Sequence, residues 1–303
     1  MSNLPQEHHR LNTRARHRAK ALTALLWVAR FRWSATALID LLLGGNGLIR
    51  KLIEQGLLVE HPVPNPLFAP VRYYVTLSKE GLTLLARHWQ EIGRSDHGHL
   101  AMCLSNFFAL PDRPDYRIRE ARFEHDLQLQ YQLAHLMRRY GPRIEGLELA
   151  DDLERVPLGK RPSKIPDAIV NLRAKDFPAS RKVSQYWIEV EFSRKNARDI
   201  DLFCAYYRNA LANITERKFT GLLIYCDPSL LAQWRKSFTR TRIPKWHFRK
   251  DQRTWVQLDA EDMHHLPELS QQDVDAIIRP FTRAAEATGG PRQAKPAKPA
   301  KQA

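Results

Sequence analysis

Two short stretches decide the fold of the carboxyl-terminal part of this chain: PDAIVNL, residues 166–172, and YWIEVEF, residues 186–192. Both are rich in β-branched and aromatic residues, and this composition predicts buried strands. Asp167 stands at the head of the first stretch, and Glu189 and Glu191 lie two positions apart on the second. Because side chains alternate along a strand, these two glutamates share one face while their apolar neighbours fill the other.

The three carboxylates of Asp167, Glu189 and Glu191 are therefore expected to converge at one edge of a sheet. Such a cluster is unfavourable unless a cation neutralises it, and hard oxygen ligands suit Mg²⁺ or Mn²⁺. The non-functional alternative is that these carboxylates, at the ends of strands, are solvated and bind no ion. The stretch 186–192 is too apolar for an exposed edge, so the pattern favours a metal-dependent phosphodiesterase site.

The overall charge favours a nucleic-acid partner. The 303 residues include 48 Lys and Arg against 33 Asp and Glu, for a formal net charge of +15. Such a balance attracts polyanions, whose counterions are released on binding. The length predicts about two domains. No apolar run reaches the roughly 18 residues of a membrane span, and the three cysteines lack metal-ligand spacing, which favours a cytoplasmic protein.

The amino-terminal part has the element order of a DNA reader. After residues 1–13, which we expect to be disordered, helices are predicted at 14–30, 34–43, 48–55 and from 79, with strands at 57–60 and 71–77. Ser34 is the expected N-cap of the second helix, and Gly56 ends the third. The pattern LIRKLIEQGLLVE followed by RYYVTLSKEGLTLL resembles the winged helix-turn-helix family across residues 20–90, within a predicted domain at 14–90.

On such a fold the third helix would enter the major groove of double-stranded DNA. Its cations, and others before it and on the ribbon, are the candidate DNA contacts: Arg14, Arg16, Arg18, Lys20, Arg50, Lys51 and Arg72. The alternative is that these side chains only solvate helix faces, or that the domain mediates protein contacts.

Residues 91–115 are expected to be a linker, and 116–285 a second domain. In that domain helices are predicted near 118–139 and 197–214, with strands near 144–149, 165–172, 185–192 and 219–226. His97 and His99 are expected in a loop rather than in a metal motif, and His264 and His265 on a helix. Residues 286–303 are low-complexity and basic, and they are expected to be disordered.

The αβββαβ succession resembles the core of the PD-(D/E)XK nuclease superfamily, an α+β or α/β fold. Pro166-Asp167 matches the "PD", while Glu191 stands where that superfamily usually has lysine. The resemblance implies that Lys195, or else Lys182, could supply the missing amine. It also implies that Glu124, on the helix that flanks the site, is a fourth acidic group.

A second resemblance covers both domains, roughly residues 20–226. The motifs FEHDLQLQYQL, IPDAIV, YWIEVEFSRKN and FCAYYRNAL, which follow the winged helix, resemble the replication-relaxation family and the MobC-type relaxases of mobilisable plasmids. That resemblance implies a metal-dependent nickase that recognises an origin of transfer or replication. Its expected partners are double-stranded DNA at that site and other relaxosome or coupling proteins.

Three rival interpretations stay open at this point. Tyr206 or Tyr207 could act as a covalent nucleophile, although their helical apolar pattern favours core or groove-facing aromatics. The nuclease-like domain could be vestigial in a replication or transcription regulator, because Glu191 replaces the lysine. The chain could also be a restriction-type endonuclease that cuts both strands.

A final cationic segment, residues 234–255, interleaves arginine and lysine with tryptophan and phenylalanine. Cations with aromatics suit a nucleic-acid groove, in which rings stack on unpaired bases. We list Arg240, Arg242 and Lys245 as DNA-binding candidates. The alternative is a solvated helix and loop whose tryptophans pack inward.

Overall fold

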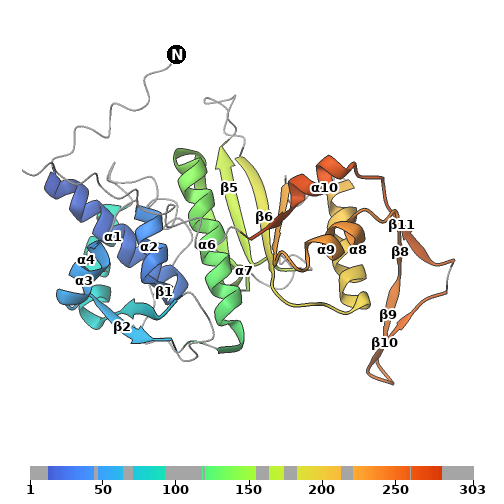
Figure 1. Ribbon diagram of the computed structural model, residues 1–303, viewed down its shortest axis with the longest axis horizontal. Coiled ribbons are helices and arrows are strands. Elements are labelled where there is room, and N and C mark those ends of the chain that lie inside the picture. Colours follow the sequence, from blue (N-terminus) through green and yellow to red (C-terminus); the bar gives the residue numbers. More distant parts are fainter. Residues whose placement is uncertain are drawn as a thin grey trace, which may run out of the picture.

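The computed structural model shows a mixed α+β protein (Figure 1). It describes residues 13–43, 47–63, 71–92, 118, 120–154, 164–173, 183–212, 221–259 and 261–281. Most of the predicted disordered ends and linker, as well as His97, His99 and Lys182, lie outside the described residues. Within the described ranges, none of the helices combines the length and apolarity that a membrane crossing requires.

The amino-terminal part contains helices around a small antiparallel sheet. Its elements are α1 (Thr13–Phe31), β1 (Ser34–Ala35), α2 (Thr36–Leu43), α3 (Leu48–Glu54), β2 (Leu58–Pro62), β3 (Tyr73–Leu77) and α4 (Lys79–Ile92). The strand order is β1-β3-β2. Ser34 does not cap a helix as predicted: it lies in β1, opposite Val75, and accepts a hydrogen bond from the Trp27 indole at 3.1 Å.

The carboxyl-terminal part is built on a mixed sheet. Its elements are η2 (Glu120–Arg122), α6 (Phe123–Tyr140), η3 (Gly141–Arg143), β4 (Ile144–Leu149), α7 (Ala150–Glu154), β5 (Ala168–Arg173), β6 (Val183–Glu191), α8 (Ala197–Ala212), β7 (Gly221–Cys226), α9 (Leu231–Phe238), β8 (Arg242–Pro244), β9 (Trp246–Arg249), β10 (Thr254–Gln257), β11 (Met263–His265), α10 (Gln271–Ile277) and β12 (Ile278–Pro280). The five-stranded sheet has the order β12-β7-β6-β5-β4. Strand β6 pairs antiparallel with β5 and parallel with β7.

The two faces of this sheet bury different helices. Alternate residues such as Val170, Ile188 and Leu223 join the hydrophobic cluster that includes α6, while Ile169, Trp187 and Leu222 join the cluster that includes α8. This is the alternation expected of strands buried on both sides. Glu189 and Glu191 lie two and four residues after Trp187, so they share its face of β6, which is the face covered by α8.

Helix α6 lies between the amino-terminal elements and the sheet (Figure 1). Trp33 stacks on Phe123 at 4.7 Å between ring centroids. The Gln130 side chain, fully buried, donates to the Trp33 carbonyl at 3.1 Å. One hydrophobic cluster runs from α1 through α6 into the sheet, so the two parts share a core.

The segment after β7 departs from the predictions in one respect. Residues 263–265, with His264 and His265, form strand β11 rather than a helix, because they pair with β8. Trp234 is buried on α9, as the inward-packing alternative expected, whereas Trp255 lies exposed on β10. The inward-packing alternative therefore holds for Trp234 and not for Trp255.

Candidate functional site

The site forms where β5 begins and β6 ends. Ala168 pairs with Ile188, so Asp167, immediately before β5, lies beside the last residues of β6. The Asp167 Oδ2 atom accepts a hydrogen bond from the Val190 backbone amide at 2.8 Å. That bond fixes the carboxylate across the strand that carries both glutamates.

A cavity of about 480 Å³ opens at this edge of the sheet. Every residue that we predicted as catalytic or metal-ligating lines it: Asp167, Glu189, Glu191, Lys195 and Glu124. Helix α6 contributes Glu124 and His125, β6 contributes the glutamates, and the segment before α8 contributes Lys195. Residues that are far apart in the sequence thus meet on one open cavity.

Each of the three central carboxylates has a cationic partner. His125 Nε2 lies 3.3 Å from Asp167 Oδ2, Lys164 Nζ lies 2.8 Å from Glu189 Oε1, and Lys195 Nζ lies 2.5 Å from Glu191 Oε1. The glutamate side chains are buried, at 6% and 4% exposed, whereas both lysine side chains are 30% exposed. Glu124 has no ion-pair partner among the described residues.

Burial and pairing shift the protonation of these groups in opposite directions. Burial raises the pKa of Glu189 to about 7, although Lys164 opposes this effect. Burial likewise raises the pKa of Glu191 against the pull of Lys195. For Asp167, burial is outweighed by the hydrogen bond from His125, so its pKa is lowered. For His125, burial is outweighed by bonds to Asp126 and Asp167, which raise its pKa to about 10.

The two tyrosines of α8 differ in their surroundings. Tyr207 is fully buried, donates a hydrogen bond to Glu189, and has a raised pKa because of its burial. A phenol in that state is a poor nucleophile and orients Glu189 instead. Tyr206 is partly buried, with its ring 6.5 Å from that of Trp187 between centroids.

The chemistry of the donor set fits a hard divalent cation. Three carboxylates open on one cavity, and the raised pKa of the two glutamates reflects a burial cost that a cation would relieve. As the side chains lie, however, no group of three His, Cys, Asp or Glu residues among those described is arranged to hold an ion. An ion would therefore have to displace the protein's own cations from the carboxylates.

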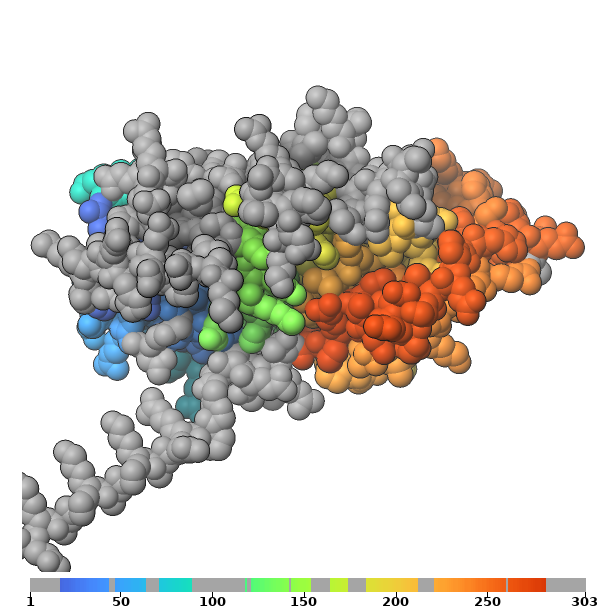
Figure 2. All heavy atoms as spheres, turned by 90° about the horizontal axis from the view of Figure 1, so that it is seen from above, coloured from blue at the N-terminus to red at the C-terminus, as the bar shows by residue number. Residues whose placement is uncertain are grey.

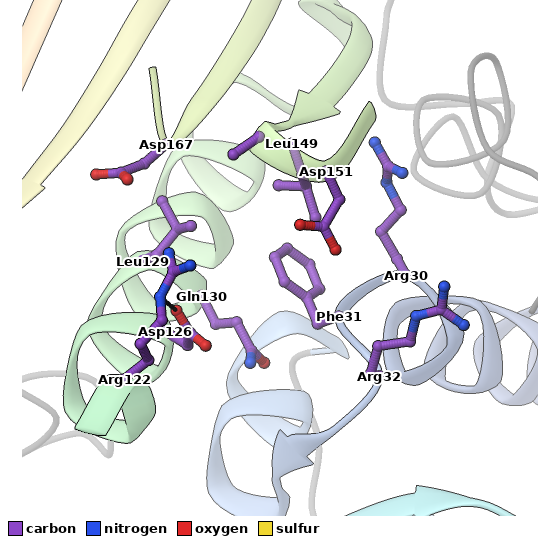
Figure 3. A pocket seen from close by; sticks show the side chains of 11 residues that line it. Arg30, Phe31, Arg32, Arg122, Asp126, Leu129, Gln130, Leu149, Asp151 and Asp167 are labelled. Atoms are coloured by element: carbon purple, nitrogen blue, oxygen red, sulfur yellow. Dashed lines mark ion pairs between the residues drawn. The ribbon is translucent and has the colours of Figure 1, made fainter. Parts of the chain in front are cut away.

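A second, smaller cavity of about 180 Å³ adjoins the first (Figure 3). The two cavities share Asp167 and Arg122. Arg30, Phe31 and Arg32 reach it from the end of α1, opposite the α6 residues Asp126 and Gln130 (Figure 3). The end of α1 thus lies close to the carboxylate site.

The predicted DNA-binding cations fall into three groups. Lys20, Lys51, Arg72 and Arg242 are exposed, as are Arg18, which bonds His88 at 2.8 Å, and Arg50, which pairs with Glu54 at 3.2 Å. Arg240 and Lys245 pair with Asp201 and Asp262, each at 2.5 Å. Arg14 and Arg16 belong to α1, but their side chains lie outside the described residues.

Sequence reasoning did not single out Lys164, and it missed the role of Tyr207 as a hydrogen-bond donor to Glu189. His125, which adjoins the predicted Glu124, is the cation that pairs with Asp167. A local signal existed for the lysine, since it stands three residues before Asp167, where the chain enters β5. Comparison of the chain with protein-family models, with curated proteins and with solved structures found no match.

Proposed function

We propose that this chain is a DNA-binding endonuclease that nicks one strand with the help of Mg²⁺ or Mn²⁺. The observation that carries the proposal is the meeting of Asp167, Glu189, Glu191, Lys195 and Glu124 on a single open cavity. A perturbed, buried carboxylate cluster beside partly exposed cations is typical of a catalytic site rather than of a structural ion pair. The resemblance of the motifs to plasmid relaxases suggests an origin of transfer as the target.

The architecture supports the same proposal. In the carboxyl-terminal part, a mixed sheet with α6 on one face and α8 on the other carries the acidic motif on neighbouring antiparallel strands. This arrangement supports the proposal of a PD-(D/E)XK-like nuclease core. In the amino-terminal part, the strand order β1-β3-β2 and the helices before β2 support the proposal of a winged helix.

A winged helix of this kind would place α3 in the major groove. Ile49 and Leu52 of α3 are buried, while Arg50 and Lys51 are exposed. The exposed pair is therefore available for phosphates or base edges. The net charge of +15 adds a sequence-independent attraction to the DNA backbone.

The residues of the cavity have distinct roles in this proposal. A divalent cation held by Asp167 and Glu189, with Glu191 or Glu124 completing the set, would stabilise negative charge on the scissile phosphate. Lys195 reaches the cavity and can hold or donate a proton there, in place of the lysine that Glu191 replaces. His125 keeps Asp167 ionised, and Tyr207 holds Glu189 in position.

A specific observation favours a second candidate, a non-catalytic replication or transcription regulator. Each central carboxylate is already neutralised by a protein cation, and the described side chains include no ready-made ion site. In that case the cluster stabilises the fold and the chain only binds DNA.

The test is incubation of the full chain with supercoiled plasmid that carries the native flanking DNA, in Mg²⁺, Mn²⁺ or EDTA. The wild type is compared with Asp167→Ala, with a Tyr206→Phe/Tyr207→Phe variant, and with Glu268→Ala as an exposed-carboxylate control outside the cavity. We expect open circles with metal, lost in Asp167→Ala and retained in Glu268→Ala. In the Tyr206→Phe/Tyr207→Phe variant we expect nicking to be reduced but not abolished, because Glu189 loses the hydrogen bond from Tyr207.

Other outcomes would replace the proposal. Loss in the Phe variant alone would assign the chemistry to a tyrosine nucleophile. Linear product would indicate a restriction-type enzyme that cuts both strands. Intact plasmid under every metal, with tight binding to the same DNA, would favour the regulator.

A further inference from the structure

The hairpin of β9 and β10 presents an exposed pair of aromatic rings. The two strands pair antiparallel, and Phe248 lies directly opposite Trp255. Their ring centroids are 5.4 Å apart, and the two residues remain 39% and 38% exposed. Because side chains alternate along a strand, the rings stand on the same face of the hairpin.

This exposure is unusual within the molecule. Five large hydrophobic side chains among the described residues are exposed, and three of them, Phe248, Trp255 and Leu258, lie on or next to this hairpin. The hairpin extends away from α8 and α9 (Figure 1), and the orange part of the chain that contains it forms the narrow end of the molecule (Figure 2). A pair of exposed aromatic rings in contact on a protruding element is typical of an interaction surface.

The base of the hairpin is anchored, so the rings are held in place. The Trp246 indole donates a hydrogen bond to the buried carboxylate of Asp201 at 3.1 Å. Just beyond β10, the Leu258 amide donates to the Lys245 carbonyl at 2.9 Å. A two-stranded hairpin alone is marginally stable in water. The first of these bonds ties the hairpin to α8, and the second extends the pairing of its strands by one residue.

The charge of the hairpin identifies the kind of partner. Arg249, Lys250 and Arg253 are exposed on it, against a single acidic residue, Asp251. Arg198 of α8 adds a guanidinium 5.8 Å from the Trp255 ring centroid. Cations around exposed rings complement a polyanion that carries flat aromatic groups, which is the chemistry of an unpaired nucleic-acid strand.

The position of the hairpin favours DNA that has just left the candidate site. Arg198, beside Trp255, stands three residues after Lys195, whose amine lines the carboxylate cavity. A duplex keeps its bases stacked inside and offers no faces to the rings. A strand with unpaired bases can place phosphates on the cations and bases on Phe248 and Trp255 at the same time.

We propose that the β9–β10 hairpin binds single-stranded DNA by stacking its bases on Phe248 and Trp255. This binding requires no cleavage, so it holds or fails independently of the proposed nickase activity.

The test is fluorescence anisotropy of the full chain in EDTA, with a labelled oligothymidylate of about 16 nucleotides and with a blunt duplex of equal length. A Phe248→Leu/Trp255→Leu variant keeps apolar bulk but loses both rings. A Phe248→Tyr/Trp255→Phe variant keeps them, and thermal unfolding shows that each variant is folded. We expect the first variant to bind the single strand at least about tenfold more weakly, with duplex binding nearly unchanged, and the second to bind like wild type.

Three results would overturn the proposal. If the leucine variant binds oligothymidylate as tightly as the wild type does, the two rings do not contribute to binding. Equal loss on single strand and duplex would reduce the hairpin to a phosphate contact. Ring-dependent binding of an oligouridylate at least about tenfold tighter than of the DNA would assign the surface to RNA.

Discussion

Two of the places where the molecule buries charge differ in how exposed the paired side chains are. Arg30, at the end of α1, pairs with Asp152 of α7 at 2.8 Å and also donates to the Leu147 carbonyl at 2.8 Å. Its guanidinium side chain is 2% exposed and the aspartate 12%. At the carboxylate site, by contrast, buried glutamates face lysines that are 30% exposed.

This difference distinguishes the Arg30–Asp152 ion pair, which we interpret as structural, from the candidate carboxylate site. Asp152 also accepts the Leu149 amide at 2.8 Å, so each charge of the structural pair is held by the other and by a backbone group. At the site the pKa of Glu189 and of Glu191 is raised, and their cations reach in from a solvent-accessible rim. Buried carboxylates whose cationic partners are partly exposed, rather than buried charge itself, distinguish the candidate site.

The largest expected effect comes from breaking the structural pair. Arg30→Met leaves Asp152 buried without its cation and removes a tie between α1 and the sheet, so we expect the free energy of unfolding to fall by about 3–5 kcal/mol. Urea denaturation in EDTA measures this loss. Lys20→Met, an exposed change on the same helix, is the control. If Arg30→Met lowers the free energy of unfolding no more than Lys20→Met does, the Arg30–Asp152 pair does not stabilise the fold and its contrast with the carboxylate site fails.

The matching change at the site should affect activity instead. Lys195→Met removes the amine that lines the cavity, so we expect nicking to fall about 100-fold. Stability should change little, because Glu191 can take up a proton when its partner is gone. Lys164→Met is the comparison variant, since Lys164 bonds Glu189 and Tyr207 without lining the cavity. A greater loss of nicking in Lys164→Met than in Lys195→Met would assign the catalytic amine to Lys164 instead of Lys195.

The pH dependence of stability offers a third contrast. Burial raises the pKa of Glu189 from 4.5 to about 7, so the folded state holds a proton that the unfolded state releases. Its contribution to stability is therefore present below about pH 4.5 and is lost as the pH rises through about 7. Between about pH 5 and pH 8 the wild type should lose about 2 kcal/mol relative to Glu189→Gln, which cannot ionise.

Denaturation in EDTA at both pH values checks this expectation, because a bound ion would change the titration. An equal change in the free energy of unfolding of the two proteins between about pH 5 and pH 8 would show that Glu189 is ionised over the whole range. Asp152 provides the internal contrast, since Asp152→Asn should lower stability at both pH values rather than alter the slope.

The architecture was largely predictable from local patterns. The mixed α+β fold is confirmed, and β4 has the predicted bounds, 144–149. The β-branched runs also predicted β5 and β6 to within a few residues, because alternation and burial act together there. Local patterns failed where long-range pairing decides the structure: Ser34 is drawn into a strand by Val75, and His264 by Ile243.

The candidate site was predictable in its acidic members but less so in its cations. Glu189 and Glu191 belong to a regular strand and Asp167 immediately precedes another, so their placement follows from strand periodicity. Lys164 precedes a strand in an irregular segment, and its partner Glu189 lies 25 residues away in the sequence. No periodic pattern encodes such a contact, which depends on how β5 and β6 meet.

The smallest expected effect is that of metal on stability. If Asp167 and Glu189 hold the ion, Mg²⁺ at ten times its dissociation constant should stabilise the fold by about 1.4 kcal/mol. The gain should be greater near pH 8 than near pH 6, because the pKa of Glu189 is about 7 and the carboxylate must lose its proton before it binds. Thermal unfolding with Mg²⁺ or EDTA measures the shift. Asp167→Asn should abolish it and Asp151→Asn, an exposed change on α7, should not. Stabilisation that survives Asp167→Asn, or that grows as the pH falls, would place the ion elsewhere and leave the carboxylates to their protein cations.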